Sequence, residues 1–171
     1  KTGYIGSAFV DYFNKYDIPY IGLSRSDVDY TNEVTFREYL SKNMYNTCYN
    51  LWKTRAIINC AGYIGKPNVD ACEANKADTL LGNSILPSRL ARICGDFEIP
   101  FVHISSGCIY GGYDKAFTEN DRPNFDFQNG SFYSGSKALA EQLIASTNRE
   151  AYIFRLRIPF DNISSPRNYI T

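Results

Sequence analysis

The sequence predicts an α/β protein of the Rossmann type, a doubly wound parallel sheet, in which residues 1–171 form one domain. Short apolar runs alternate with helix-length amphipathic stretches, and a glycine-rich turn opens the first of these stretches. Small or polar residues follow two of the runs, at 59–62 and 105–106. This alternation is typical of βαβ units around a parallel sheet.

Four apolar runs are expected to form strands, and each is apolar on both faces, as a buried parallel strand should be. They are residues 20–23, 56–59, 101–104 and 151–156. The amphipathic stretches predict helices at 6–15, 33–40, 70–93 and 132–146. Pro87 interrupts the third helix, where we expect a kink or a helix start. The Gly, Asn, Asp and Pro-rich residues 111–130 are expected to form a long surface loop.

Both ends of the sequence indicate truncation. The chain begins directly at a glycine-rich turn, residues 1–6, although such a turn is useful only when a strand delivers the chain to it. Residues 166–171 stop just as a new segment begins. We therefore expect the first strand to lie upstream of Lys1.

Charge and composition narrow the class of partner. The 18 basic and 18 acidic residues cancel, so no large electrostatic field favours nucleic acid or an anionic membrane. Five cysteines without a CxxC pair fit a reducing compartment, and the cytoplasm is expected. No apolar run approaches the roughly 20 residues of a membrane helix. The single histidine, His103, lies in an apolar run, which argues against zincins and most Ser-His-Asp hydrolases, so no metal is expected.

Three turns carry candidate cofactor-binding residues. Gly3 and Gly6 open a helix, where glycines let the backbone approach a pyrophosphate, although such pairs are also ordinary turn chemistry. Arg25 stands where an acidic residue would bind the ribose of NAD, and with Ser24 it suits the 2′-phosphate of NADP. A solvated loop arginine is the alternative. The small residues of 59–62 would let a loop pass close to the adenine or the nicotinamide ribose.

The strongest constellation is a serine pair at a strand end followed by a Tyr-x-x-x-Lys motif. Tyr133 and Lys137 are four residues apart, which places them on one helical face. A free phenol has a pKa of about 10, so an ammonium and a hydroxyl such as that of Ser106 are needed to stabilise its phenolate. The order of glycine turn, NxAG, strand-end serine and YxxxK favours a carbonyl–alcohol redox site over a surface pair in a chain with 14 tyrosines.

Together these motifs resemble the extended short-chain dehydrogenase/reductase family over essentially the whole chain. Residues 58–62, 69–73, Asn83 and 102–106 are similar to the dTDP-4-dehydrorhamnose reductase branch. Other segments resemble the bifunctional nucleotide-sugar 3,5-epimerase/4-reductases that make UDP-rhamnose in plants and some large viruses. These segments are 3–6, 65–70, 107–109, 130–134 and 166–171.

The resemblance implies NADPH-dependent reduction of a 4-keto-6-deoxy nucleotide sugar with 3,5-epimerisation, NAD being possible as cofactor. Tyr133 and Lys137 would be the reductase pair, Ser106 would polarise the C4 carbonyl, and Cys108 would be an acid/base residue for epimerisation, partnered by a lysine expected after Thr171. A substrate lobe beyond this chain and a homodimer are also implied. The implied cofactor-binding residues are Gly3, Tyr4, Ile5, Gly6, Ser24, Arg25, Asn59, Ala61, Gly62, Asn83, Tyr133 and Lys137.

Other functions stay open. A nucleotide-sugar C4-epimerase shares the Ser/Tyr/Lys set but typically retains NAD, so Arg25 and Cys108 argue against it. A non-catalytic NADP-binding regulatory subunit needs the fold without the proton relay, and the intact relay favours an enzyme. A 4,6-dehydratase is disfavoured because Gly107 and Cys108 stand where its Asp-Glu pair would follow the serine. A half-buried packing cysteine is the alternative reading of Cys108, and Cys60 fits a buried small hydrophobe.

Overall fold

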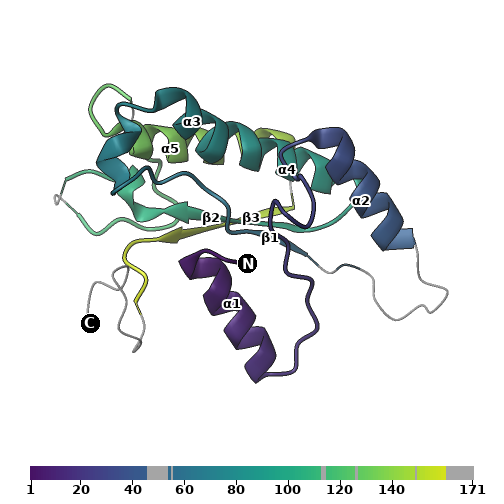
Figure 1. Cartoon of the computed structure of the whole chain (residues 1–171). Helices are drawn as coiled ribbons and strands as arrows, with labels where there is room; N and C mark the ends of the chain where they lie inside the picture. The colour runs from purple at the N-terminus through teal and green to yellow at the C-terminus, as the bar shows by residue number, and fades with distance from the viewer. Residues whose placement is uncertain (46–53, 55, 113–114, 126, 149, 161–171) are drawn as a thin grey trace. The chain divides into compact units, whose positions relative to one another are not determined.

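The structure of the chain is a computed structural model that describes all residues except 46–53, 55, 113–114, 126, 149 and 161–171 (Figure 1). The chain forms two compact units. The terminal unit comprises Lys1–Arg55 and Ile158–Thr171, and the sheet unit comprises Ala56–Arg157. Cys48 and the segment 166–171, both used in the sequence analysis, lie outside the described residues.

The described residues of the terminal unit form the helices α1 (Tyr4–Lys15) and α2 (Glu33–Tyr45). Gly3 is the extended residue before α1, and its carbonyl accepts the first helical hydrogen bond from Ser7 N at 2.8 Å. The predicted helices at 6–15 and 33–40 are therefore confirmed, with α1 starting two residues earlier and α2 ending five residues later than expected. Glu33 in the first turn of α2 places a negative charge at the positive helix N-terminus. No side chain caps the start of α1.

The predicted strand at residues 20–23 is wrong, because the described residues there have no strand structure. A strand exists only as part of a hydrogen-bonded ladder with a neighbour. Here the carbonyl of Leu23 accepts instead from the amino terminus of Lys1 at 3.1 Å. The ring of Tyr20 lies 5.5 Å from that of Phe13 on α1, and Ile21 is 69% exposed. This apolar run therefore packs on α1 at Tyr20 and is exposed at Ile21, and it does not form a strand.

The sheet unit is built on three parallel strands in the order β1 (Ile57–Asn59), β2 (Phe101–Ser106) and β3 (Ala151–Leu156). Phe101 stands opposite Ile57 on one side and Ala151 on the other. The other three predicted strands are confirmed, and β2 extends two residues further than expected, to Ser106. This parallel sheet with its helices is Rossmann-like, as the sequence predicts.

The stretch expected as one long helix at 70–93 forms four successive pieces. They are the 3₁₀ turn η1 (Val69–Cys72), α3 (Lys76–Leu80), the π-helical turn η2 (Leu81–Ile85) and α4 (Leu86–Asp96). Pro87 lies in the first turn of α4, where its missing N–H costs no helical hydrogen bond. The expected helix start at Pro87 is confirmed. The preceding π turn buries Asn83 and Ser84, a feature often found at functional sites.

Helix α5 (Phe132–Thr147) precedes β3 in the chain and confirms the predicted helix at 132–146. Ser131 caps its start, accepting a hydrogen bond from Ser134 N on Oγ at 3.1 Å. Ser84 Oγ on η2 donates to the carbonyl of Ser136 at 2.7 Å, which joins the π turn to α5. Figure 1 shows α3, α4 and α5 on one face of the sheet. Between them lie fully buried apolar side chains, including Ile93, Phe101 and Ile144.

The expectation that each strand is apolar and buried on both faces is wrong for β3. Arg155 on this strand contacts Glu141 of α5, whereas Tyr152 and Phe154 are 59% and 50% exposed. Alternate residues of a strand point to opposite faces, so the two aromatic rings project away from α5. The described residues of the loop at 111–130 form neither helix nor strand, as expected. No helix in the described part of the chain is long and apolar enough to span a membrane.

Candidate active site

Ser106 and Tyr133 meet where β2 ends and α5 begins. Ser106 is the last residue of β2, and its side chain lies near enough to that of Tyr133, the second residue of α5, to lower the pKa of the phenol. Ser106 Oγ also accepts a hydrogen bond from Cys108 N at 3.1 Å, so the hydroxyl is held by the turn that follows its own strand. Ser106 is only 5% exposed. The structure thus brings two of the predicted catalytic residues near each other.

Burial of Tyr133 sets its protonation state. Desolvation raises the pKa of the phenol, and the Ser106 side chain works in the opposite direction without cancelling it. The nearby thiols of Cys108 and Cys72 also raise the pKa of Tyr133. The side chain is therefore a neutral phenol at neutral pH, which is the form that can donate a proton.

Lys137 lies one helical turn after Tyr133 and is 6% exposed. Its ammonium donates to the carbonyl of Ile104 on β2 at 3.3 Å. Burial lowers the pKa of Lys137 to about 8, and the charge of Glu141 partly opposes this shift. Because the pKa still lies above 7, a positive charge is present at neutral pH on the helical turn that follows the phenol.

The backbone of Gly62 lies close to Lys137. A Cβ atom at this position would lie 3.5 Å from Lys137 Nζ and 3.2 Å from Asn83 Oδ1. Any larger side chain would fill the space in front of the ammonium. The predicted role of Gly62, close approach of a ligand to the backbone, is consistent with this geometry.

Asn83 on η2 holds the loop that follows β1. Its Oδ1 accepts from Tyr63 N at 2.7 Å and its Nδ2 donates to Tyr63 O at 2.8 Å, while Nδ2 also reaches Ser136 Oγ at 3.3 Å. Both polar atoms of this fully buried amide are thus engaged by the protein itself. Asn83 positions the loop, and a direct contact of Asn83 with the cofactor stays a prediction.

Asn59 shapes the NxAG turn from inside. Its Oδ1 accepts from Ala61 N at 3.0 Å, and its Nδ2 donates to His103 Nδ1 at 3.2 Å. The only histidine is fully buried, and burial lowers the pKa of His103 to about 3, with a smaller effect from the charge of Lys137. A neutral imidazole therefore sits behind the turn that carries Ala61.

Cys108 and Tyr133 line the same cavity, which has a volume of about 240 Å³. Cys108 is half-buried and carries a free thiol. The guanidinium of Arg157 enters the cavity wall and donates to the carbonyl of Gly107 at 3.1 Å. The complete lining is Val69, Cys108, Tyr110, Phe125, Ser131, Tyr133, Ser134 and Arg157. All four predicted catalytic residues thus lie in the sheet unit, three of them at or directly beside this cavity.

A second hollow, of about 410 Å³, lies along the loop after β1 and contains Gly62. Its other lining residues are Tyr63, Ile64, Gly65, Lys66 and Asn75. Gly65 has a φ of +69°, and a Cβ there would lie 2.7 Å from the carbonyl of Asn68, so the bend of this loop requires glycine. The hollow adjoins the space in front of Lys137 through Gly62.

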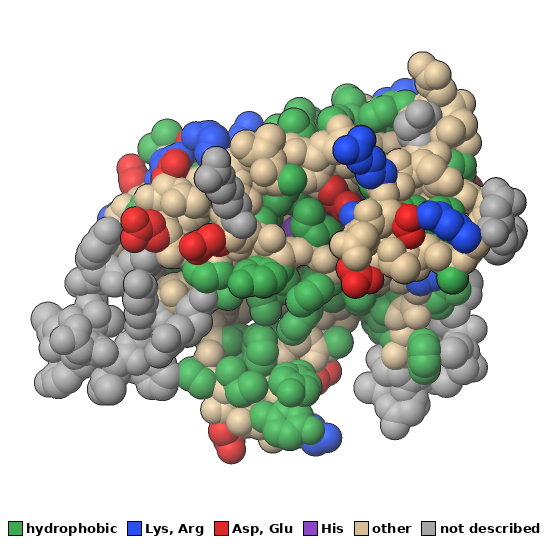
Figure 2. All heavy atoms as spheres, turned by 180° about the vertical axis from the view of Figure 1, so that it is seen from behind, with side chains coloured by type: hydrophobic (Ala, Val, Ile, Leu, Met, Phe, Trp, Pro, Cys, Tyr) green, Lys and Arg blue, Asp and Glu red, His purple; other side chains and the backbone are tan. Residues whose placement is uncertain are grey.

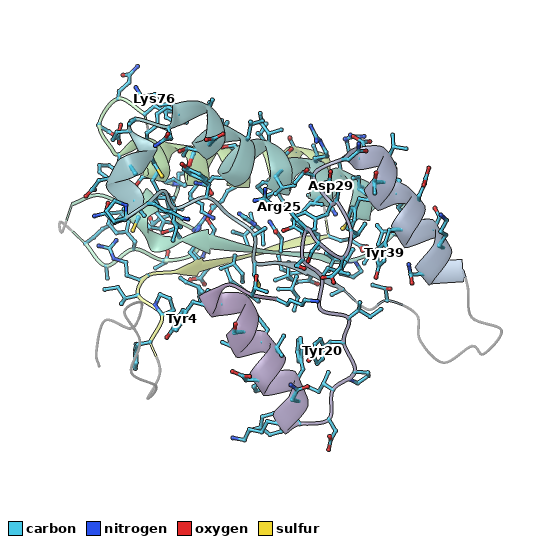
Figure 3. The ribbon with its side chains drawn as sticks, in the orientation of Figure 1. Tyr4, Tyr20, Arg25, Asp29, Tyr39 and Lys76 are labelled. Carbon is cyan, nitrogen blue, oxygen red and sulfur yellow. The ribbon has the colours of Figure 1, made fainter. Side chains whose placement is uncertain are left out.

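The other predicted cofactor residues belong to the terminal unit. Gly3, Tyr4, Ile5 and Gly6 form the start of α1, where Gly3 has no side-chain cap and a Cβ on it would meet no atom within 4 Å. Figure 3 labels Tyr4 at this helix start. Such an uncapped, open N-terminus suits an anion. Their contact with a dinucleotide stays a prediction.

Ser24 and Arg25 lie in a turn held together by Asp27. The carboxylate of Asp27 accepts from Ser24 N at 2.7 Å and pairs with Lys1 Nζ at 2.8 Å. These contacts lower the pKa of Asp27 to about 2, the contact with Lys1 contributing most. Arg25, labelled in Figure 3, is exposed. An exposed guanidinium on an ordered turn is compatible with phosphate binding and with a solvated loop arginine alike.

Sequence reasoning missed two acidic residues that support α5. Glu73 Oε1 accepts a hydrogen bond from Phe132 N, at the start of α5, at 2.6 Å. Glu141, a further four residues beyond Lys137, accepts from Ser105 Oγ at 2.6 Å and pairs with Arg155 at 2.8 Å. The repeat of Tyr133, Lys137 and Glu141 at four-residue spacing is a signal that could have identified Glu141. No local pattern could have identified Glu73.

Comparison with known proteins places these features in context. The whole chain, residues 1–171, matches the family described as RmlD substrate binding domain. A trifunctional UDP-glucose 4,6-dehydratase/UDP-4-keto-6-deoxy-D-glucose 3,5-epimerase/UDP-4-keto-L-rhamnose-reductase from Arabidopsis thaliana is 36% identical over 128 residues, which cover 70% of this chain and 18% of that protein. A bifunctional dTDP-4-dehydrorhamnose 3,5-epimerase/dTDP-4-dehydrorhamnose reductase from the same organism is also 36% identical, covering 70% of this chain and 41% of that protein.

Solved structures show the same likeness in three dimensions. The UDP-rhamnose synthase of Acanthamoeba polyphaga mimivirus matches with a TM-score of 0.80 and 25% identity, over 98% of this chain and 57% of that one. A dTDP-4-dehydrorhamnose reductase from Bacillus anthracis in complex with NADP matches with a TM-score of 0.69 at 19% identity, over 95% of this chain and 53% of that one, and supports the fold alone. The chain thus spans about half the length of these structural relatives and less than half of the curated ones.

Proposed function

Because this chain belongs to the RmlD substrate binding domain family, we propose that the protein containing it reduces the C4 ketone of a 4-keto-6-deoxy nucleotide sugar, with NADPH as the reductant. The finer assignment includes 3,5-epimerisation of the sugar before reduction, in rhamnose-nucleotide synthesis. It is supported by the activities named for the two plant relatives. The protein would then act on a small, soluble substrate, consistent with the balanced charge of the chain.

One observation carries the proposal: a buried phenol, a hydroxyl and an ammonium converge at one strand end. Ser106 lies near enough to Tyr133 to lower the pKa of the phenol, and Lys137 lies on the next turn of the same helix. A regulatory subunit that only binds a dinucleotide has no need for this arrangement. In such a subunit, burying Lys137 would cost free energy without a functional gain, because desolvation disfavours its charged form.

The residues around Lys137 fit a nicotinamide nucleotide. An ammonium carries three donors, and the contact with Ile104 O uses one, so further donors can face ribose hydroxyls beside the backbone of Gly62. Gly3–Gly6 would meet the pyrophosphate, and Arg25 with Ser24 the 2′-phosphate of NADP. The reduced nicotinamide supplies the hydride when it is bound.

The protein's own residues supply the proton and stabilise charge. As negative charge develops on O4 of the sugar, Tyr133 donates its phenolic proton to that oxygen. The ammonium of Lys137 stabilises the resulting phenolate, and the Ser106 hydroxyl holds the carbonyl oxygen in line with the phenol. Because burial raises the pKa of Tyr133, the phenol is protonated before the reaction, as the direction of reduction requires.

Cys108 is the residue we assign to epimerisation. A ketone at C4 acidifies the C–H bonds at C3 and C5, so a base on one face of the sugar can remove one of these protons while an acid on the opposite face supplies another, which inverts the centre. The Cys108 thiol lines the cavity together with Tyr133, so one bound sugar can meet both groups. The thiolate is the reactive form of the side chain.

The test is substrate-dependent oxidation of NADPH by the full-length protein. We expect the absorbance of the reduced nicotinamide to fall when UDP-4-keto-6-deoxyglucose is added, and the product to be the 6-deoxyhexose with the C3 and C5 centres inverted. The dTDP sugar in a parallel reaction identifies the preferred nucleotide. Tight NADPH binding without any substrate-dependent decay would contradict the proposal and favour a regulatory subunit.

A further inference from the structure

Glu141 is the centre of a buried network directly behind the candidate active site. It follows Lys137 by one turn of α5 and is 6% exposed. Its Oε1 accepts from Ser105 Oγ at 2.6 Å, and its Oε2 accepts from Arg155 Nη2 at 2.8 Å and from Arg155 Nε at 3.1 Å. The carboxylate is thus neutralised by a two-pronged guanidinium contact, the strongest geometry for such a pair.

Arg155 extends the network from β3 to the loop after β2. Its Nη1 donates to the hydroxyl of Tyr110 and to the carbonyl of Glu119 at 3.0 Å. Its guanidinium carbon lies 5.4 Å from the centre of the Tyr110 ring. The Tyr110 hydroxyl in turn donates to the carbonyl of Asp121 at 2.8 Å. One guanidinium therefore joins helix α5, strand β3 and two points of the loop.

Tyr110 is also a wall of the cavity that contains Tyr133 and Cys108. Its ring stacks on that of Phe117 at 4.6 Å, and the carbonyl of Ile109, just before it, accepts from Phe125 N at 3.2 Å. The loop thus reaches the cavity through Tyr110 and Phe125. Arg155 ties this wall to the helix carrying Tyr133 through Glu141, and Phe127 of the same loop also packs on Phe132 of α5, with ring centres 5.0 Å apart.

We propose that Glu141 and Arg155 are positioning residues for the sugar-binding cavity: by holding the Tyr110 hydroxyl, they fix the loop wall opposite Tyr133 at the spacing that the substrate requires. The inference rests on the proposed function for the identity of the sugar. A buried ion pair gives little net stability compared with well-packed apolar side chains, so its geometry rather than its energy explains the arrangement. Lysine cannot replace it, because lysine has no planar fork to reach both Glu141 and Tyr110.

Two variants of the full-length protein remove the same link from opposite ends. Arg155→Lys keeps the charge but loses the fork, and Tyr110→Phe keeps the ring but loses the hydroxyl. We expect each to raise KM for the keto sugar nucleotide at least about tenfold, the effect of one charge-assisted hydrogen bond, with kcat within about threefold and unchanged NADPH affinity. The double variant should be no worse than Arg155→Lys, because the contact between Arg155 and Tyr110 that Tyr110→Phe removes is already lost in Arg155→Lys. Tyr152→Phe, on the exposed face of β3, is the matched control and should have no effect.

Hydrogen exchange tests the same contact without turnover. Backbone amides of residues 115–121 should exchange faster in both variants than in the wild type, while those of 138–147 on α5 should be unaffected. Loss of kcat, NADPH affinity and α5 protection together would make the pair a general stabilising contact and overturn the proposal, as would unchanged KM and unchanged exchange. If the wild-type protein turns over no keto sugar, the proposed function fails, and the exchange data alone decide whether Arg155 holds the loop.

Discussion

Lys137 is the residue whose charge state the site controls most closely. The same burial that raises the pKa of Tyr133 lowers the pKa of Lys137 to about 8, so two pKa values that nearly coincide in free side chains are moved apart. A phenolate formed during the reaction then has a partner that is positive below pH 8 and neutral above it. The Tyr-x-x-x-Lys spacing could be read from the sequence, but this shift could not, because it depends on how deeply α5 is buried against β2.

The first prediction follows from the charge of Lys137. The rate of keto-sugar reduction should be constant between pH 6.5 and 7.5 and fall as pH rises through about 8, because the ammonium is lost there. The measurement is kcat/KM of the full-length protein as a function of pH. Lys137→Met should be slower by about a hundredfold and should lack this alkaline limb. A wild-type profile that stays flat to pH 9.5 would show that the ammonium is not required.

The second prediction concerns Cys108, which shares the cavity with Tyr133. Cys108→Ser should slow the exchange of solvent deuterium into C3 or C5 of the keto sugar by about a hundredfold, since a hydroxyl is a far weaker base than a thiolate. Reduction of an already epimerised ketone should change by less than about threefold and is the internal control. NMR of the sugar protons measures the exchange. Equal losses in both reactions would leave Cys108 as a packing residue.

Helix α5 is the element on which the site depends, and its start is held from a distant part of the chain. Glu73, just after η1, accepts from Phe132 N, and Lys76, labelled in Figure 3, lies 5.3 Å from the centre of the Phe132 ring. Ser131 supplies the local cap. The helix and its cap could be predicted from sequence, because Ser131 precedes a regular apolar pattern. The contact with Glu73, 59 residues away, could not.

The third prediction tests this contact. Glu73→Ala should lower the free energy of unfolding by about 1 kcal/mol, because it removes both an acceptor and a negative charge from the N-terminus of α5. Denaturant unfolding of the full-length protein measures the change. Glu38→Ala, an exposed glutamate within α2, should stay within about 0.5 kcal/mol of the wild type. An effect at Glu73 no larger than at Glu38 would mean that Ser131 alone holds the helix start.

Within the sheet unit, the sequence predicted where helices and strands lie better than it predicted the turns that divide the expected helix at 70–93. β2 and α5 were predicted because each shows its own periodicity, and Pro87 marked the start of α4. The π turn before Pro87 has no local signature, because it depends on Asn83 bonding to Tyr63 and Ser84 bonding to α5. In the terminal unit, residues 20–23 were wrongly predicted as a strand. They have the apolar content of a strand, but none of them pairs with a neighbouring strand among the described residues.

At the scale of the molecule, the apolar surface and the buried polar groups differ between the two units. Figure 2 shows apolar side chains gathered over α1 of the terminal unit, where Tyr12 and Tyr16 are 55% and 54% exposed. In the sheet unit, polar groups lie in the centre of the core instead. His103 is fully buried, and its Nε2 is the buried side-chain atom without a hydrogen-bond partner among the described residues. The isolated His103 was readable from the sequence, whereas its contact with Asn59 was not.

The fourth prediction uses His103 as a probe of global stability. Burial lowers the pKa of His103 to about 3, so the unfolded chain binds a proton below pH 6.5 that the folded chain does not. Stability is therefore complete above pH 6.5 and falls as pH decreases. His103 alone should contribute a loss of about 2 kcal/mol between pH 6.5 and pH 5. Unfolding at several pH values measures the slope, which should be flatter for His103→Gln, whatever the absolute stability of that variant. An equal slope in both proteins would place the acid sensitivity elsewhere.

The candidate catalytic residues could be identified from the sequence because they lie in short motifs. The side chains that contact and position them could not. Ser105, Glu141 and Arg155 are separated by 36 and 14 positions in the chain and meet only in the folded sheet unit. Sequence motifs identify the groups that react, since reactivity depends on residue type. The supporting contacts depend on which elements become neighbours, and this requires the structure.

The most direct test of the account is transfer of deuterium from the reduced cofactor to the sugar. With NADPH deuterated at the transferring position and UDP-4-keto-6-deoxyglucose, the full-length protein should place deuterium at C4 of the product. Tyr133→Phe should bind NADPH with wild-type affinity and transfer no measurable deuterium, because only the proton donor is lost. Transfer by Tyr133→Phe at the wild-type rate would contradict the central claim that this phenol, held by Ser106 and Lys137, completes the reduction.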